Sequence, residues 1–157
     1  MKKHFFPVFL DISEMNILVV GGGNIATRRV RTLLEFASNI IVVAPEISED
    51  LKKLVRDGAI EWIQDEYKSE YIYEKDIVIA ATNHPEVNHM VHRDSKKMEQ
   101  ECGKSILTNV ADDKSLCDFY FPGIVKKDNI VIGINSGGSS PKETKQIRKQ
   151  IETILNT

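Results

Sequence analysis

Short apolar runs alternate along this chain with segments of helical periodicity. Residues 17–20, 40–44, 60–63, 77–81 and 105–110 are predicted to be buried strands. Helical patterns separate them at about 24–36, 48–57 and 85–100, and the polar segment 64–74 is expected to hold one helical turn. Strands that are apolar on both faces and alternate with helices are typical of parallel sheets. The pattern therefore predicts an α/β fold: a Rossmann-like doubly wound parallel sheet with helices on both faces.

The pattern changes on either side of this predicted sheet. Residues 6–10 are expected to form a short strand, as an added edge strand or hairpin arm. Residues 118–125 and 129–134 predict two more strands, with a hairpin turn at 126–129. A basic amphipathic helix ends the chain, and its apolar face carries Ile147, Ile151, Ile154 and Leu155.

A hairpin and one helix are too small to be stable alone. This C-terminal region should pack either on the sheet domain or on a second copy of the chain, and we favour a homodimer. The expected division is a nucleotide-binding domain over residues 1–113 and a dimerisation and substrate-site region over residues 114–157.

A glycine cluster follows the first predicted strand at once. Gly21-x-Gly23-x-x-Ala26 matches the dinucleotide-binding fingerprint in its alanine-ending form. The first glycine permits the tight turn, the second lets the backbone approach a pyrophosphate, and the small third residue lets helix and strand pack closely. The helix that begins there points its free N–H groups towards the phosphates. The strand before and the helix after favour a cofactor site, and the alternative is merely a tight turn.

In open α/β sheets, ligands bind at the carboxyl ends of the strands. Glu46 follows the second strand, where an acidic residue usually holds the adenosine ribose. No Lys or Arg adjoins it to meet a 2′-phosphate, so NAD is favoured over NADP. The predicted cofactor-binding residues are Gly21, Gly22, Gly23, Asn24, Ile25, Ala44, Pro45, Glu46, Thr82 and Asn83.

Asp112 and Asp113 follow the fifth predicted strand directly. A carboxylate at this edge, beside a nicotinamide ring, could accept a proton as hydride leaves. The alternative is that these residues form a turn or cap a helix. His84, His89 and His92 lie in and before one helix. His89 and His92 are three residues apart and could share a helix face, but no third ligand stands at a known metal spacing from them, so no metal site is predicted.

The composition is that of an ordinary globular protein. The chain has 157 residues, 41% of them hydrophobic and 28% charged, with a net charge of −2 that gives no argument for nucleic-acid binding. The apolar run near the N-terminus is too short for a signal peptide, and no run approaches transmembrane length. Cys102 and Cys117 form no metal or redox motif. Free thiols fit a reducing compartment, so a cytoplasmic location is expected.

Three strings, in this order, resemble the precorrin-2 dehydrogenase family, the NAD-dependent module of siroheme synthase and its stand-alone relatives. They are Val19-Val20-Gly21-Gly22-Gly23-x-x-Ala26-x-Arg28, Ala80-Ala81-Thr82-x-x-x-x-Val87-Asn88 and Asn109-Val110-x-Asp112. The resemblance implies NAD-dependent oxidation of precorrin-2 to sirohydrochlorin by a homodimer, with Asp112 as the general acid/base. The implied substrate-binding residues are Asn109, Ser136, Gly137, Gly138, Ser139, Ser140 and Lys142. Other basic residues near that loop are Lys145, Arg148 and Lys149.

The sequence also departs from this family. Family members commonly continue into a helical domain beyond the final helix, whereas this sequence ends at Thr157. Asp113-Lys114-Ser115 replaces the usual prolines and small residues after the aspartate. Two alternatives stay open. The protein could be bifunctional, with sirohydrochlorin ferrochelatase activity as well, or it could be a non-catalytic NAD(H)-sensing module. If it is a dehydrogenase only, a separate chelatase is expected.

Overall fold

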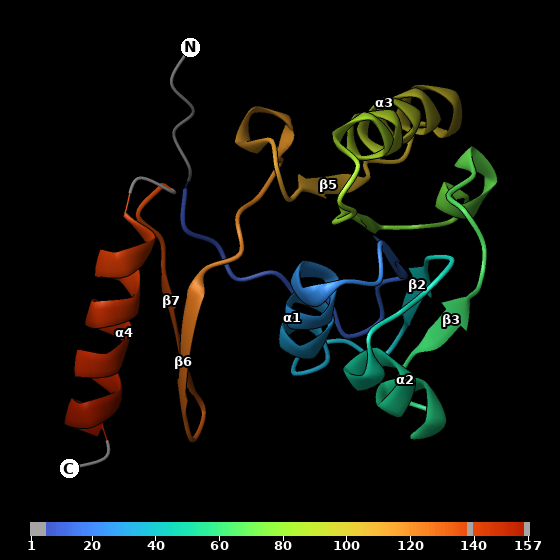
Figure 1. Cartoon of the computed structure of the whole chain (residues 1–157). Coiled ribbons are helices and arrows are strands. Elements are labelled where there is room, and N and C mark those ends of the chain that lie inside the picture. The colour runs from blue at the N-terminus through green and yellow to red at the C-terminus, as the bar shows by residue number, and fades with distance from the viewer. Residues whose placement is uncertain (1–5, 138–139, 156–157) are drawn as a thin grey trace. The chain divides into compact units, whose positions relative to one another are not determined.

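The computed structural model describes residues 6–137 and 140–155. The chain forms two compact units: residues 8–118 make up one, and the residues from Phe119 onwards, together with those before Val8, make up the other. Figure 1 traces the elements of both units from the N-terminal to the C-terminal end.

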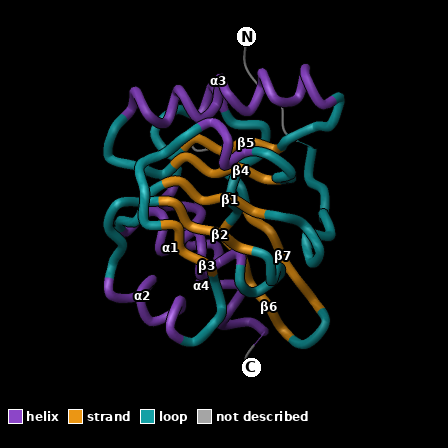
Figure 2. The backbone as a smooth tube through the Cα atoms, turned by 90° about the vertical axis from the view of Figure 1, so that its right-hand side faces the viewer, coloured by secondary structure: helices purple, strands orange, loops and turns teal. Residues whose placement is uncertain are grey.

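The unit of residues 8–118 is built on a five-stranded sheet with the order β3-β2-β1-β4-β5 (Figure 2). The strands are β1 (Ile17–Val20), β2 (Ile40–Val43), β3 (Glu61–Ile63), β4 (Ile77–Ala80) and β5 (Leu107–Val110). Every pairing in this sheet is parallel. All residues of β1 and β4 are buried, because helices cover both faces of these central strands. The predicted parallel sheet is confirmed.

Helices and helical turns connect these strands. They are α1 (Asn24–Leu33), α2 (Glu49–Arg56), η1 (Ser69–Ile72), α3 (Pro85–Cys102) and η2 (Lys114–Leu116). Successive strands progress from β1 towards one edge and then from β4 towards the other. Because such crossovers are right-handed, α1 and α2 cover one face and α3 covers the opposite face. The strand order therefore reverses between β1 and β4, where Rossmann-like sheets open a crevice for ligands.

The ends of these helices follow local chemistry. Ser48 caps α2, since its hydroxyl accepts a hydrogen bond of 3.2 Å from the backbone N–H of Leu51. Pro85 opens α3, where a missing N–H costs nothing. Gly103 ends the same helix with a left-handed φ of 66°.

The C-terminal unit contains an antiparallel hairpin and one helix. Strand β6 (Gly123–Lys127) pairs with β7 (Ile130–Ile134), and α4 (Pro141–Leu155) packs against β6. The predicted turn was too long, because only Asp128 and Asn129 leave the ladder. The predicted first strand began too early: Pro122, which has no N–H to donate to a ladder, directly precedes β6.

The strand predicted at residues 6–10 is wrong. This segment has no regular secondary structure, and Phe6 and Phe9 are 86% and 76% exposed. Apolar character alone does not make a strand, which needs a neighbouring backbone to pair with. Pro7 in the middle of the run further weakens its pairing capacity.

Candidate functional site at the carboxyl edge of the sheet

The glycine loop, residues 21–23, leaves β1 at the reversal of strand order. Gly21 has a φ of 121°, and a Cβ there would lie 2.7 Å from the carbonyl carbon of Ala81, just after β4. Only glycine fits this turn, because any side chain would overlap the neighbouring backbone. The backbone N–H of Gly21 donates to the carbonyl of Val43, so the loop joins the ends of β1, β2 and β4.

Gly22 packs against the segment that follows β2. A Cβ on Gly22 would overlap the carbonyl oxygen of Glu46 and lie 2.9 Å from the Cα of Ile47. The carbonyl of Gly22 accepts a hydrogen bond of 2.9 Å from the backbone N–H of Ser48. The sequence fingerprint did not include this close approach, which locks the glycine loop to the start of α2.

Gly23 differs from its neighbours, because a Cβ there would meet no atom within 4 Å. It is the N-cap of α1, no side chain caps this helix end, and its first turn contains no acidic residue. Asn24 and Ile25, the next two residues, are exposed. An uncapped helix N-terminus with open space before it offers backbone N–H groups and a positive dipole end to an anion.

Below this opening, Ala26 and Thr27 are buried, as the packing of α1 on the sheet requires. The hydroxyl of Thr27 donates to the carbonyl of Gly23 at 2.9 Å and lies 2.8 Å from the hydroxyl of Ser48. The helix start is therefore held from inside the protein, and its outer side stays accessible.

The segment after β2 is also held by side chains from β3 and from the residue that follows it. The Trp62 indole N–H donates to the carbonyl of Ala44 at 2.9 Å, and the Gln64 amide donates to that of Pro45 at 3.3 Å. Ala44 is buried, whereas Pro45 and Glu46 are exposed. Glu46 thus stands at the surface beside the glycine loop, where a ribose-binding carboxylate is expected.

A buried amide joins the loops after β4 and β5. The Asn88 side chain accepts hydrogen bonds from the backbone N–H and the hydroxyl of Thr82, at 3.0 and 2.8 Å. It donates to the carbonyl of Thr82 at 3.2 Å and to Oδ1 of Asp112 at 2.9 Å. Asp112 itself is exposed, as is Asn83, so the carboxylate lies at the open edge of the sheet with one oxygen held.

The adjacent Asp113 makes different contacts. Its carboxylate accepts hydrogen bonds from the backbone N–H and hydroxyl of Ser115, at 2.9 and 2.6 Å, and so caps η2. These two bonds lower the pKa of Asp113, and the nearby imidazoles of His89 and His92 act in the same direction. His89 Nε2 lies 3.4 Å from the carboxylate. The capping role that the sequence left open for both aspartates falls on Asp113.

The inner side of β5 carries the predicted substrate residue Asn109. It is buried, and its amide lies 3.5 Å from the sulfur of Cys117. The same sulfur contacts the backbone N–H of Val110 at 3.2 Å, and the backbone N–H of Asp118 donates to the carbonyl of Thr108, so residues 117–118 run beside β5.

Arg29 in α1 is mostly buried, and burial lowers the pKa of its guanidinium to about 10.

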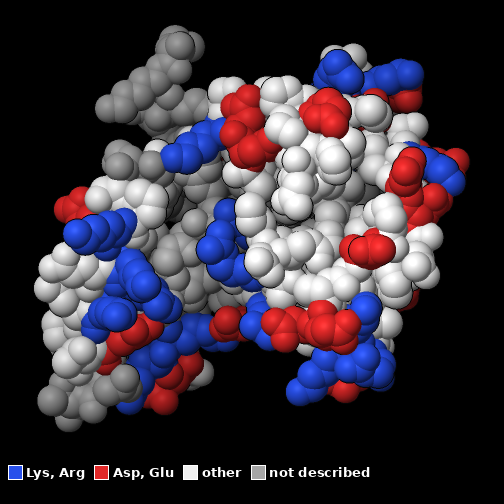
Figure 3. All heavy atoms as spheres, in the orientation of Figure 1, with Lys and Arg blue, Asp and Glu red and all other residues white. Residues whose placement is uncertain are grey.

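The remaining predicted substrate residues belong to the C-terminal unit. Ser140 caps α4 by accepting from the backbone N–H of Glu143 at 3.3 Å, and Ser136 accepts from the hydroxyl of Thr144 at 3.0 Å. Gly137 has a left-handed φ of 63°. Gly138 and Ser139 lie outside the described residues. Lys142 is exposed in the first turn of α4, a helix over which Lys and Arg side chains gather, interspersed with Asp and Glu (Figure 3).

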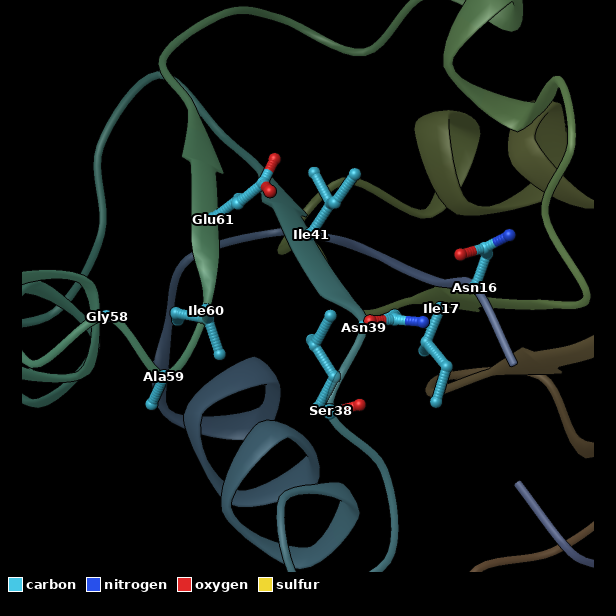
Figure 4. A pocket seen from close by; sticks show the side chains of 10 residues that line it. Asn16, Ile17, Ser38, Asn39, Ile41, Gly58, Ala59, Ile60 and Glu61 are labelled. Carbon is cyan, nitrogen blue, oxygen red and sulfur yellow. The ribbon is translucent and has the colours of Figure 1, made fainter. Parts of the chain in front are cut away.

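A pocket of about 220 Å³ lies at the opposite edge of the sheet. It is lined at the amino ends of β1, β2 and β3, by Asn16, Asn39 and Glu61 among others (Figure 4). Cofactors of Rossmann-like folds bind at the carboxyl ends, so this pocket is not the cofactor site.

Among the residues that the structure describes, no group of three or more His, Cys, Asp or Glu side chains is arranged to hold a metal ion. Over the same residues, no helix has both the length and the apolar character needed to cross a membrane.

Sequence reasoning overlooked Asn88 as a site residue and noted it only within a family string. A signal was present, because the buried residues of α3 are Asn88, Val91 and Ser95, at helical spacing. An amide on the core face of a helix must find hydrogen-bond partners, and here it finds Thr82 and Asp112.

The comparison with protein families decides the class of the sheet unit. A family model described as "Putative NAD(P)-binding" matches residues 8–123. The chain belongs to this family. The match spans the glycine loop, the segment after β2 and the loops after β4 and β5.

Curated proteins with named activities are similar to almost the whole chain. A "Probable multifunctional siroheme biosynthesis protein HemA" of Ruminiclostridium josui is 41% identical over 150 residues, which is 95% of this chain and 28% of that protein. A "Siroheme synthase" of Actinobacillus succinogenes is 36% identical over 152 residues, 97% of this chain and 31% of that protein. The chain thus spans less than a third of the length of these relatives.

A solved structure named "SirC, precorrin-2 dehydrogenase" has the same fold. It aligns with a TM-score of 0.79 and 27% sequence identity, covering 96% of this chain and 71% of that chain. The alignment includes the C-terminal hairpin and helix as well as the parallel sheet, which confirms the predicted architecture of both parts.

Proposed function

We propose that this chain oxidises precorrin-2 to sirohydrochlorin with NAD⁺ as the electron acceptor. The observation that carries the proposal is the exposed Asp112 carboxylate, held by Asn88 at the same sheet edge as the glycine loop. Membership of the NAD(P)-binding family, similarity to siroheme synthases and the SirC fold support the same reaction.

The residues around the glycine loop fit a dinucleotide. Gly23 and the N–H groups of Asn24 and Ile25 would hold the pyrophosphate, because this helix end is uncapped and open. Gly21 and Gly22 shape the loop, and Ala44 and Pro45 form the floor of the adenosine side. Glu46 would accept from the ribose hydroxyls and disfavour a 2′-phosphate, which supports NAD⁺ over NADP⁺. Thr82 and Asn83 would border the nicotinamide side.

Oxidation of precorrin-2 removes a hydride and a proton from the reduced macrocycle. NAD⁺, when bound, supplies the hydride acceptor. Asp112 takes the proton, since it is exposed, ionisable and placed beyond the carboxyl end of β5. Its fixed position lets the proton leave without rearrangement of the loop.

Recognition of the substrate uses groups that pair with carboxylates, because precorrin-2 carries several. Lys142 and the donors around Ser136, Gly137 and Ser140 are suited to this, and the proposed set also includes Asn109, Gly138 and Ser139. We place these residues in a homodimer built through the C-terminal unit, with residues 114–157 as the dimerisation and substrate region. A separate chelatase would then act on the product.

A cytoplasmic location is part of the same proposal. The supporting observation is that neither Cys102 nor Cys117 takes part in a disulfide. Reduced thiols fit a reducing compartment, where disulfide bonds are rare.

The test is an anaerobic assay that follows NADH formation and the sirohydrochlorin spectrum together. We expect Asp112→Asn to bind NAD⁺ as the parent does, and its turnover of precorrin-2 to fall by about 10²-fold or more. Parental turnover by this variant would remove Asp112 from the mechanism. NAD(H) binding without any oxidation of precorrin-2 by the parent would instead indicate a sensing module. Addition of ferrous ion tests the chelatase alternative, which persistence of free sirohydrochlorin would rule out.

A further inference from the structure

Asn88 is the most constrained polar side chain of the sheet unit. It lies in the second turn of α3 and is 0% exposed. Its amide oxygen accepts from the backbone N–H of Thr82 and lies 2.8 Å from the Thr82 hydroxyl, and its amide nitrogen donates to the Thr82 carbonyl and to Asp112. Both polar atoms of the amide therefore have partners within the protein.

The partners determine which way the amide points. The backbone N–H of Thr82 is a donor only, so the atom that faces it must be the amide oxygen. The NH₂ group then faces the carbonyl of Thr82 and Oδ1 of Asp112, both acceptors. A flipped amide would set donor against donor and acceptor against acceptor, in a buried place where water cannot compensate.

This arrangement transmits the rigidity of α3 to an exposed carboxylate. Asp112 follows the last residue of β5 by two positions, in a loop where an unheld side chain would sample several rotamers. Asn88 is anchored through Thr82 to the end of β4, the strand next to β5. The position of the Asp112 carboxylate is therefore set by the sheet rather than by its own loop.

We propose that Asn88 is a positioning residue for Asp112, which sets the rotamer of the carboxylate and presents it for proton transfer. The inference rests on the proposed function, since it requires Asp112 to take the proton. Asn88 acts on the rate of the chemical step through Asp112, and contributes little to the affinity for NAD⁺.

A double-mutant cycle tests this, with Asn88→Ala, Asp112→Ala and the combined variant compared with the parent. We expect Asn88→Ala to lower kcat by about 10- to 10²-fold, because small misplacement of a reacting group is costly. The dissociation constant for NAD⁺ should change less than about threefold. In the Asp112→Ala background, Asn88→Ala should lower kcat no further, because residues that act as a unit are not additive.

Ser95→Ala is the matched control. Ser95 is equally buried on the same helix, and its hydroxyl donates to the carbonyl of Val91. This variant loses a buried hydrogen bond of α3 without touching Asp112, and should keep the parental kcat. A comparable loss of kcat in Ser95→Ala would mean that general loosening of the helix explains the Asn88 effect.

Asn88→Asp provides a variant of the same shape in case Asn88→Ala folds poorly. It keeps an acceptor for the backbone N–H of Thr82 but turns an oxygen towards both the Thr82 carbonyl and Oδ1 of Asp112, so the two carboxyl groups share a proton. We expect the acidic limb of the kcat–pH profile to move to higher pH by about one unit or more. The change leaves in place Asp113 and the imidazoles of His89 and His92 that act on it.

The outcomes distinguish a failure of the role proposed for Asn88 from a failure of the role proposed for Asp112. If Asp112→Ala slows the reaction but Asn88→Ala costs the same factor in both backgrounds, Asn88 is merely structural and the inference is wrong. An unshifted pH profile in Asn88→Asp would also overturn it. If Asp112→Ala leaves kcat unchanged, the proposed proton acceptor is wrong, whatever Asn88 does.

Discussion

Two loops at the carboxyl edge of the sheet are held in place by different means. The glycine loop after β1 is fixed by backbone packing, since Gly21 and Gly22 leave no room for a Cβ. In the aspartate loop, residues 111–113 after β5, Ala111 donates a backbone hydrogen bond to Ala80, and the two aspartates are held through their side chains, with Asn88 on Asp112 and Ser115 on Asp113. Backbone packing shapes a surface for a cofactor, whereas side-chain bonds orient a reactive group.

Neighbouring residues within each loop also differ in their surroundings. Gly22 is packed against the segment after β2, and Gly23 faces open space. Asp112 accepts from a buried amide of α3, whereas Asp113 accepts its two hydrogen bonds within its own turn and lies 3.4 Å from the imidazole of His89 on α3. In each loop one residue maintains the fold and its neighbour is available to a ligand. Substitution of one residue at a time can therefore separate the effect on stability from the effect on binding or activity.

The largest effect is expected for Gly22→Ala. The new methyl group would overlap the Glu46 carbonyl, part of a backbone that Trp62 and Ser48 hold in place. Overpacking of this kind costs roughly 1–3 kcal/mol, and we expect about 3 kcal/mol because the clash is with backbone. Urea denaturation would measure the lower free energy of unfolding, and NAD⁺ binding should be lost with it. Parental stability would mean that the segment after β2 moves freely.

Gly23→Ala should give the opposite combination. No atom within 4 Å of the new methyl group resists it, so the free energy of unfolding should fall by less than about 1 kcal/mol. The methyl group would, however, occupy the space before the helix end where a pyrophosphate binds. We expect the dissociation constant for NAD⁺ to rise about 10- to 10²-fold, as for loss of charge-assisted hydrogen bonds. Calorimetry measures it, and unchanged affinity would place the pyrophosphate elsewhere.

Most of the sheet unit could be predicted because its information is local. A run such as Ile17–Val20 is apolar on both faces, and glycines follow where the chain must turn tightly. Residues 6–10 share the apolar character but have no partner strand, a fact that only the folded chain contains. The prediction failed there because pairing is a tertiary property.

The site was predictable to the same extent. Glu46 and Asp112 could be placed at the carboxyl edge of the sheet, since parallel strands bring their carboxyl ends together. Spacing alone could not distinguish Asp112 from Asp113, as both follow β5. The distinction depends on Asn88, which is 24 residues away from Asp112 in the chain and meets it only after β4 and β5 pair.

Asp113→Ala should have the smallest effect on activity and sharpens the contrast between the two aspartates. Because Asp113 bonds to Ser115 within its own turn, we expect kcat to stay within about threefold of the parent. The lowered pKa of Asp113 means that its charge stabilises the fold above the unfolded value near 3.8, and that this contribution disappears as the pH falls below it. Urea denaturation from neutral to acidic pH should therefore show the variant less stable at pH 7, with the gap closing below about pH 4. Asp113→Asn, which keeps an acceptor for Ser115 without the charge, separates capping from electrostatics. A loss of kcat as large as that of Asp112→Ala would show that the aspartate loop works as one unit, and the division between its two carboxylates would be wrong.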